Sequence, residues 1–285
     1  MVARPPHEGF HWRIWGAELL GTALLMLGGL SAVCLLFGRS SPVADAVPSH
    51  SLRLLVTGLL FSGVNSLLAV SPLGRLSGAH LNPAVTLSFR FLGRVSASDV
   101  AGYLTSQFLG ALAGAAALRL AWRGIAESVD GGVTLPAVPL AAAFALEAAM
   151  TGALMVVIFA FVSSARLARW TPLAIWPVIA ALVWVGSSST GTSLNPARSS
   201  APAIVFASGL DVLWLYVLAP TTGAVAVALV WRRAHPRRQP KTAKLFHDPR
   251  YACSLATELP AKPPVTGVPA PRLSPQLHPA TRRNE

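Results

Sequence analysis

The sequence predicts an all-α integral membrane protein of six transmembrane helices and two re-entrant half-helices, arranged as an inverted repeat. Three observations lead to this fold class. Of the 285 residues, 53% are hydrophobic and 12% are charged, whereas soluble domains carry about 25% charged residues. Six apolar stretches are long enough to cross a hydrocarbon core about 30 Å thick. Two short, closely similar segments that contain Asn-Pro-Ala lie between these stretches.

The six predicted spans are separated by polar links. They are Ile14–Phe37, Leu52–Val70, Val100–Trp122, Ala137–Val162, Ala168–Ser187 and Val212–Trp231. Pro172 and Pro177 interrupt the start of the fifth span, and proline disfavours the helix interior. The spans define a membrane domain over residues 14–233, with a short N-terminal segment (1–13) before it and a C-terminal tail (234–285) after it.

The two similar segments are Ser-Gly-Ala-His-Leu-Asn-Pro-Ala-Val (Ser77–Val85) and Thr-Gly-Thr-Ser-Leu-Asn-Pro-Ala-Arg (Thr190–Arg198), 113 residues apart. Each is typical of a helix start, because Asn is a favoured N-cap and Pro is tolerated at the first helical position. Only about ten apolar residues follow each one, too few to cross the membrane. The predicted half-helices are therefore Asn82–Leu92 and Asn195–Ala207.

The order of span, span, half-helix and span occurs twice, over residues 14–122 and 137–233. An odd number of spans in each copy makes the second copy enter the membrane from the opposite side, which produces an inverted repeat. The segment Glu18-Leu-Leu-Gly-Thr22 of the first span has a counterpart, Glu147-Ala-Ala-Met-Thr151, in the fourth. This second repeated feature supports the internal duplication.

The segments that precede the half-helices are expected to be extended. Irregular backbone at membrane depth is tolerated where it is buried in protein or lines water. The carbonyl groups of these segments therefore predict a line of hydrogen-bond acceptors along a narrow wet pathway. The residues assigned to that line are Gly78, Ala79, His80, Gly191 and Ser193.

Two half-helices that enter from opposite faces bring their N-termini together near the membrane midplane. Each N-terminus carries roughly half a positive charge, and the amides of Asn82 and Asn195 add hydrogen-bond donors at the same place. A cation meets a positive field there, while a neutral hydroxyl solute meets both donors and acceptors. The site therefore favours uncharged polar molecules and opposes ion conduction.

The predicted spans contain two carboxylates, Glu18 and Glu147, and the second half-helix contains one arginine, Arg198. Arg198 is three residues into the second half-helix, where an arginine must face water or a partner; we favour a place in the pore over pairing with carbonyl groups. Glu18 and Glu147 form either a proton relay or a support for the adjacent loops, and we favour the support because a carboxylate can accept several backbone N–H bonds. His80, without Cys, Asp or Glu nearby in sequence, predicts no metal site.

Positive charge gathers on the links that would share one side of the membrane and in the tail. From Arg232 onward there are 11 Lys and Arg residues against 3 Asp and Glu residues. Cytoplasmic segments carry such an excess, so both termini are expected in the cytoplasm and the protein in the plasma (inner) membrane. The Pro-rich tail (234–285) is predicted to be disordered. A nucleic-acid partner is the less favoured interpretation of its charge.

These motifs resemble those of the aquaporin, or major intrinsic protein, family, and the resemblance extends from about Trp12 to Trp231. It implies a right-handed bundle of six helices and two half-helices. It also implies a homotetramer with one pore in each protomer, which passes water or small neutral solutes passively through surrounding lipid, without any cofactor.

The resemblance also implies roles for individual residues. Asn82 and Asn195 correspond to the midplane asparagine pair, and Arg198 to the arginine of the selectivity filter. Counting back from each asparagine assigns the other three filter positions to Ser62, Val183 and Thr192. All three are small, which implies a wide constriction lined partly by hydroxyl groups.

The sequence therefore predicts a passive channel for water and small uncharged solutes such as glycerol, urea or metalloid hydroxides. A coupled secondary transporter is one alternative, since inverted repeats with half-helices occur there too. A non-conducting membrane scaffold is the other. An enzyme is not indicated, because the sequence offers no nucleophile motif, metal-ligand set or phosphate loop.

Overall fold

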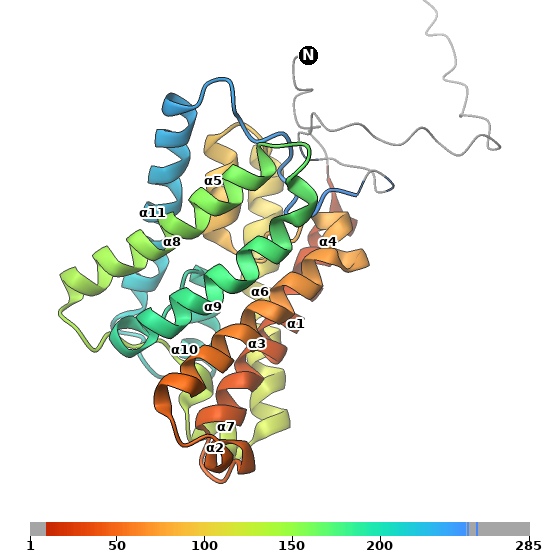
Figure 1. Cartoon of the computed structure of the whole chain (residues 1–285). Coiled ribbons are helices and arrows are strands. Elements are labelled where there is room, and N and C mark those ends of the chain that lie inside the picture. The colour runs from red at the N-terminus through yellow and green to blue at the C-terminus, as the bar shows by residue number, and fades with distance from the viewer. Residues whose placement is uncertain (1–9, 249, 251–254, 256–285) are drawn as a thin grey trace, which may run out of the picture.

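The structure is a computed structural model that describes residues 10–248, 250 and 255. The described chain forms a bundle of tilted helices (Figure 1). Six helices in it are long and apolar enough to cross a membrane, which confirms the predicted fold class. They are α1 (Trp12–Phe37), α3 (His50–Val70), α6 (Ala97–Trp122), α8 (Leu140–Val162), α9 (Thr171–Thr190, preceded by the 3-10 turn η2, Ala168–Trp170) and α11 (Leu213–Ala234).

The two half-helices are α5 (Pro83–Phe91) and α10 (Pro196–Val205), both within the predicted ranges. Short turns of helix complete the connections: α2 (Pro42–Ala46), α4 (Pro72–Ser77), α7 (Gly124–Glu127) and the 3-10 turn η1 (Asp130–Gly132). No boundary of a predicted span shifts by more than three residues, and one shift of that size is at α8, which begins three residues late. Pro139 precedes its first turn, and the N–H of Ala137 donates instead to the carbonyl of Ser189 at 2.8 Å.

The helices pair as an inverted repeat requires. The most extensive contacts are those of α1 with α6, α3 with α9 and α8 with α11. Exchanging the two repeats converts the first of these pairs into the third and leaves the second unchanged. The half-helices obey the same rule, because α5 packs on α11 and α10 packs on α6. This correspondence supports the predicted internal duplication.

Equivalent side chains make equivalent bonds in the two repeats. The hydroxyl of Tyr103 on α6 donates to the carbonyl of Ser77, and that of Tyr216 on α11 donates to the carbonyl of Thr190. Each acceptor lies five residues before the asparagine that begins a half-helix. Both buried tyrosines therefore fix the start of a loop that leads to a half-helix.

Close helix crossings depend on glycine at two equivalent positions. A Cβ atom on Gly110 of α6 would lie 2.2 Å from the carbonyl oxygen of Leu19 on α1. A Cβ atom on Gly223 of α11 would lie 2.0 Å from the carbonyl oxygen of Ala148 on α8. Such small residues allow membrane helices to approach closely.

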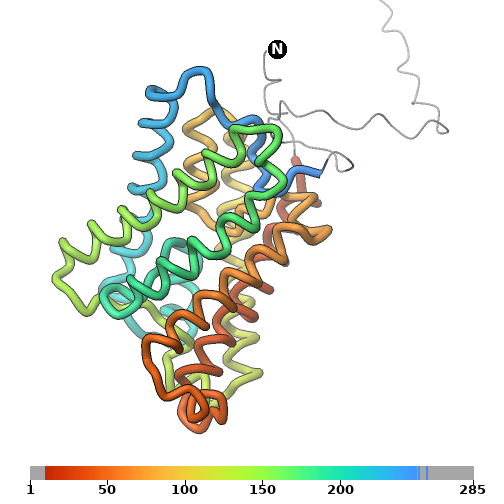
Figure 2. Tube along the Cα trace, viewed as in Figure 1, coloured from red at the N-terminus to blue at the C-terminus, as the bar shows by residue number. Residues whose placement is uncertain are grey.

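The beginning of the C-terminal tail differs from the sequence expectation. Residues 242–245, which fall within the predicted disordered tail, are buried against the bundle. In Figure 2 the blue chain that follows α11 runs across the end of the bundle to the orange α4 region. The composition of the tail did not reveal that its backbone finds hydrogen-bond partners on the helices. Most of the tail and residues 1–9 lie outside the described residues.

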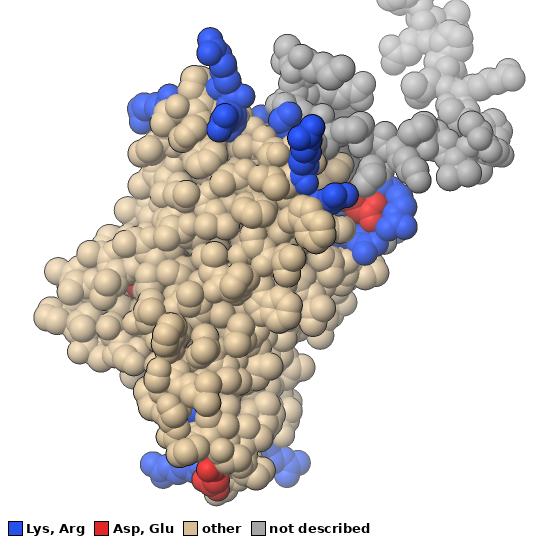
Figure 3. Space-filling view, viewed as in Figure 1, with Lys and Arg blue, Asp and Glu red and all other residues tan. Residues whose placement is uncertain are grey.

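Charge is distributed unevenly over the surface. Figure 3 shows Lys and Arg residues at the end of the molecule that holds α4 and the end of α11, a belt with very few charged residues around the middle, and both signs at the opposite end. The belt matches the surface that lipid would cover. The basic end is the one where cytoplasmic loops would lie.

A Gly223→Ala substitution should destabilise the protein, because its methyl group would collide with the carbonyl of Ala148. Overpacking of this kind costs about 1–3 kcal/mol, so the thermal unfolding temperature in detergent should fall. Gly16→Ala is the matched control, since a Cβ atom there meets nothing within 4 Å. Equal unfolding temperatures for the two variants would contradict the close packing of α8 and α11.

Candidate functional site: a pore between the half-helices

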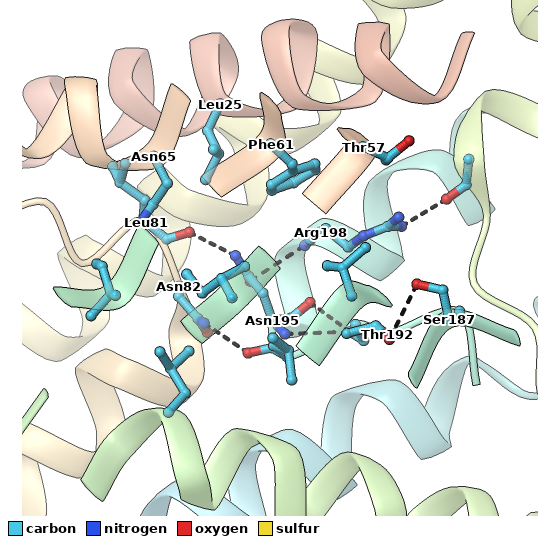
Figure 4. Close-up of a pocket in the computed structure, with 18 of the residues that line it drawn as sticks. Leu25, Thr57, Phe61, Asn65, Leu81, Asn82, Ser187, Thr192, Asn195 and Arg198 are labelled. Atoms are coloured by element: carbon cyan, nitrogen blue, oxygen red, sulfur yellow. Dashed lines mark hydrogen bonds between the residues drawn. The ribbon is translucent and has the colours of Figure 1, made fainter. Parts of the chain in front are cut away.

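A cavity of about 240 Å³ runs through the middle of the bundle, past the starts of both half-helices. Figure 4 shows that its walls come from several elements, including α1, α3, α9 and the two loops that precede α5 and α10. Much of the wall is apolar, with Leu25, Val85, Leu154, Ile158, Ile175 and Ile179. The loops and Arg198 contribute polar groups to the same cavity.

The two asparagines lie together and cap the half-helices. The Oδ1 atom of Asn82 accepts from the N–H of Ala84 at 2.9 Å, and that of Asn195 accepts from Ala197 at 3.0 Å. Both asparagines lie on the cavity wall. The predicted meeting of the two helix starts is therefore present in the structure.

Each asparagine also binds the loop of the other repeat. The Nδ2 atom of Asn82 donates to the carbonyl of Leu194 at 2.8 Å, and that of Asn195 donates to the carbonyl of Leu81 at 2.9 Å (Figure 4). An amide nitrogen carries two hydrogens. Each asparagine therefore spends one N–H on the opposite loop and keeps a second for a molecule in the cavity.

The loops before the half-helices follow an unusual backbone path. Ala79 and Leu81 have φ angles of 55° and 48°, and their counterparts Thr192 and Leu194 have 48° and 56°. The left-handed region is unfavourable for residues other than glycine, by roughly 1–2 kcal/mol each. Such a conformation persists only where its surroundings hold it.

Two buried carboxylates hold these loops. The carboxylate of Glu18 accepts from the N–H groups of His80 and Leu81 at 3.0 and 2.8 Å. That of Glu147 accepts from the N–H groups of Ser193 and Leu194 at 2.9 and 3.1 Å. These bonds agree with the loop-supporting role expected from the sequence, because each carboxylate satisfies N–H groups that the strained loop leaves without a helical partner.

The predicted line of backbone acceptors is only partly exposed to the cavity. His80, Gly191 and Ser193 lie on the cavity wall, whereas Gly78 and Ala79 do not. The carbonyl of Gly78 accepts instead from the N–H of Leu245 at 2.9 Å. At this end of the cavity the C-terminal segment is therefore hydrogen-bonded to a carbonyl group that was expected, from the sequence, to line the pore.

Arg198 lies on the cavity wall with 8% of its surface exposed. Its Nη1 atom donates to the carbonyl of Gly132 in η1 at 2.7 Å. Its guanidinium also lies over the ring of Phe61, 5.9 Å from the ring centre. Arg198 thus both binds a carbonyl group and lies on the cavity wall. From the sequence, these two arrangements were treated as alternatives.

The helix α3 presents a different residue from the one expected at the constriction. The cavity is lined by Thr57, Phe61 and Asn65, spaced three or four residues apart on one helix face. Ser62 does not line it; its Oγ donates to the carbonyl of Gly58 at 2.6 Å. Gly58 sits against the backbone of α9, and Ser62, one turn later, shares that face and so turns away from the cavity.

The remaining two filter candidates lie on the cavity wall. Val183 comes from α9 and Thr192 from the loop before α10. The hydroxyl of Ser187 donates to that of Thr192 at 3.3 Å. Phe61, Val183, Thr192 and Arg198 therefore line the same cavity, and Phe61 adds an aromatic ring that the sequence reasoning did not place there.

Comparison with known proteins identifies the family. A sequence model of the major intrinsic protein family matches residues 7–231. The chain belongs to this family. The resemblance inferred from the two motifs is confirmed.

Similar proteins of this family come from several organisms. The chain is 34% identical over 221 residues to the glycerol uptake facilitator protein-like 6 of Lactiplantibacillus plantarum, which covers 76% of this chain and 95% of that protein. It is 32% identical over 231 residues to aquaporin Z of Rhodopseudomonas palustris, with 77% and 92% covered. Its fold is similar to that of an aquaglyceroporin from Plasmodium falciparum, with a TM-score of 0.63 at 23% identity over 78% of this chain and 96% of that one.

Several residues of this major intrinsic protein escaped the sequence reasoning. Gln107 donates to the carboxylate of Glu18 at 2.9 Å and to the hydroxyl of Thr86 at 3.0 Å. Tyr103 and Tyr216 anchor the loops. The tyrosines share the 113-residue offset of the two motifs, a signal that could have found them. No comparable signal marks Gln107, whose counterpart in the second repeat is Pro220.

Replacing Glu147 by Ala should destabilise the second loop, because two buried N–H groups would lose their acceptor. Each unpaired group costs about 1–3 kcal/mol, so thermal stability in detergent should fall by more than the experimental error. Glu127→Ala is the matched control, since that carboxylate is exposed and pairs with the exposed Arg119, an arrangement worth about 0–1 kcal/mol. Equal effects of the two variants would contradict the loop-supporting role.

Proposed function

We propose that the cavity is the conduction path of a passive channel for water and small uncharged solutes such as glycerol. The observation that carries the proposal is the meeting of two half-helix starts at a cavity that passes through the bundle. The names of the relatives, aquaporin and glycerol uptake facilitator, support the same class of cargo.

The electrostatics of the centre favour neutral solutes. The N-termini of α5 and α10 both point their partial positive charges at the cavity, and one N–H of each asparagine remains for a solute. An incoming cation or hydrated proton meets this field without a carboxylate on the cavity wall among the described residues. We therefore infer that the channel excludes ions while water and hydroxyl solutes pass.

The constriction would set the size of the solute. Phe61 and Val183 supply apolar surface, while Arg198 and Thr192 supply polar groups. The buried Oγ1 atom of Thr57 has no hydrogen-bond partner among the described residues, and Thr57 lies on the same wall. This mixture suits water and small polyols.

The two alternatives have less support. A coupled transporter needs a titratable or ion-binding cluster that faces the substrate path, and Glu18 and Glu147 are instead occupied by loop N–H groups. A scaffold that does not conduct leaves the polar cavity without a purpose. The passive channel accounts for both observations.

We further propose a homotetramer in the plasma (inner) membrane with both termini in the cytoplasm. The concentration of Lys and Arg at the end that holds α4 and the end of α11 supports this orientation (Figure 3). The tetramer rests on the family resemblance. Small solutes and lipid are the partners expected, and the cavity itself calls for no cofactor or metal.

The channel assignment predicts osmotically driven flux in reconstituted vesicles. Stopped-flow light scattering should show faster shrinkage of proteoliposomes than of protein-free liposomes of the same lipid, with a lower activation energy. This test uses the full-length chain, with Asn82, Asn195 and Arg198 unaltered. Shrinkage at the rate of the bare lipid, for water and for glycerol alike, would overturn the assignment.

The filter assignment distinguishes two neighbouring residues. Phe61→Ala should raise glycerol and urea permeability relative to water several-fold, because it removes the ring beside Arg198. Ser62→Ala is the control and should leave the ratio unchanged, since Ser62 faces α9. A changed permeability ratio in Ser62→Ala and an unchanged ratio in Phe61→Ala would show that Ser62, and not Phe61, is the filter residue on α3.

A further inference from the structure

The cytoplasmic end of the cavity is occupied by a segment of this chain. Leu245 lies on the cavity wall with 2% of its surface exposed. It belongs to the same hydrophobic cluster as Val85, Ile158 and Ile175, which come from α5, α8 and α9. The segment that carries it, Lys241–Leu245, follows α11 and is defined here as the tail plug.

The tail plug is bound through its backbone to the elements around the cavity. The N–H of Leu245 donates to the carbonyl of Gly78 at 2.9 Å, and Nε2 of His80 donates to the carbonyl of Ala243 at 2.7 Å. The N–H of Lys241 donates to the carbonyl of Val162 at the end of α8, at 2.9 Å. Backbone bonds thus tie the plug to the first loop and to α8.

Two basic side chains reinforce the seat. Lys244 is 1% exposed, and its Nζ donates to the carbonyl of Arg75 in α4 at 2.7 Å. The guanidinium of Arg75 in turn pairs with the carboxylate of Asp248 at 3.2 Å and lies over the ring of Phe246 at 5.5 Å. Hydrogen bonds from Arg250, helped by Arg75, lower the pKa of Asp248 to about 2, so its carboxylate stays ionised at physiological pH.

The two-fold symmetry of the bundle shows what the plug replaces. Gly78 and His80 of the first loop correspond to Gly191 and Ser193 of the second. Gly191, Ser193 and His80 lie on the cavity wall and Gly78 does not, but only in the first loop are the equivalent groups, the carbonyl of Gly78 and Nε2 of His80, bonded to the tail plug. A cytoplasmic mouth symmetric with the other would present those groups to solvent.

We propose that the tail plug is an autoinhibitory element that closes the cytoplasmic mouth of the pore, so that the channel conducts fully only when Lys241–Leu245 leaves its seat. This inference rests on the proposed channel function. The seat consists of hydrogen bonds to the first loop, α4 and α8, which water can replace, together with the burial of Leu245 in the apolar wall. Seating is therefore a reversible equilibrium, and the full chain retains a residual flux.

The test compares osmotic water permeability of the full-length chain with two variants, reconstituted at equal protein content. Leu245→Gly removes the apolar anchor and Lys244→Ala removes the bond to α4; both should raise permeability several-fold. Arg237→Ala is the matched control, because it removes an exposed cation from the same tail, and it should not alter the flux. Equal and high flux in the full chain and in Leu245→Gly would overturn the plug and leave the channel intact. Flux at the level of bare lipid in both would overturn the channel and the plug together.

A labelling measurement reports on the seat without any flux. In a Cys253→Ser background, an Ala243→Cys thiol should react slowly with a water-soluble maleimide, because Ala243 is fully buried. An Arg237→Cys thiol should react fast. The Cys253→Ser chain without an added cysteine gives the labelling rate of the buried Cys34, which is subtracted. Adding Leu245→Gly should accelerate the reaction at position 243. Equal rates at 243 and 237 in the otherwise unaltered tail would overturn the proposal.

Discussion

The reciprocal hydrogen bonds between Asn82 and Leu194 and between Asn195 and Leu81 are the constraint on which the rest of the structure depends. They join the tips of two half-helices that belong to different repeats. Two N-termini with like partial charges would otherwise repel each other. Because each asparagine caps its own helix and binds the opposite loop, the positive ends are held together beside the cavity, and the proposed selection of neutral solutes rests on their field.

The buried carboxylates stabilise the strained backbone of the two loops in that arrangement. Four non-glycine loop residues adopt left-handed conformations, which alternate along the chain and turn the carbonyl groups away from regular ladders. Glu18 and Glu147 accept hydrogen bonds from loop N–H groups. The loop carbonyl groups are left to bind the asparagines, the tail or a molecule in the cavity. Charged groups within the membrane often mark a proton path. Here the hydrogen bonds of Glu18 and Glu147 support a structural role for both carboxylates.

The sequence predicted those parts of the fold that are encoded locally. The Asn-Pro-Ala starts specify N-caps through residues adjacent in the chain, and the odd number of spans in each copy dictates the inversion. The face of α3 depended instead on Gly58 meeting the backbone of α9 at Ala180, 122 positions later in the sequence, so Phe61 rather than Ser62 lines the cavity. The plug was missed for a similar reason. The tail that contains it is Pro-rich and basic, a composition typical of disorder, and its bonds to the Gly78 loop, to α4 and to the end of α8 join residues far apart in the sequence.

The most direct test is an experimental density map of the protein in lipid, at a resolution that shows ordered water. The account predicts a line of water molecules through the cavity, with one within hydrogen-bond distance of Nδ2 of both Asn82 and Asn195. A map with the two asparagines far apart, or with a dry centre and Arg198 remote from the water, would contradict it.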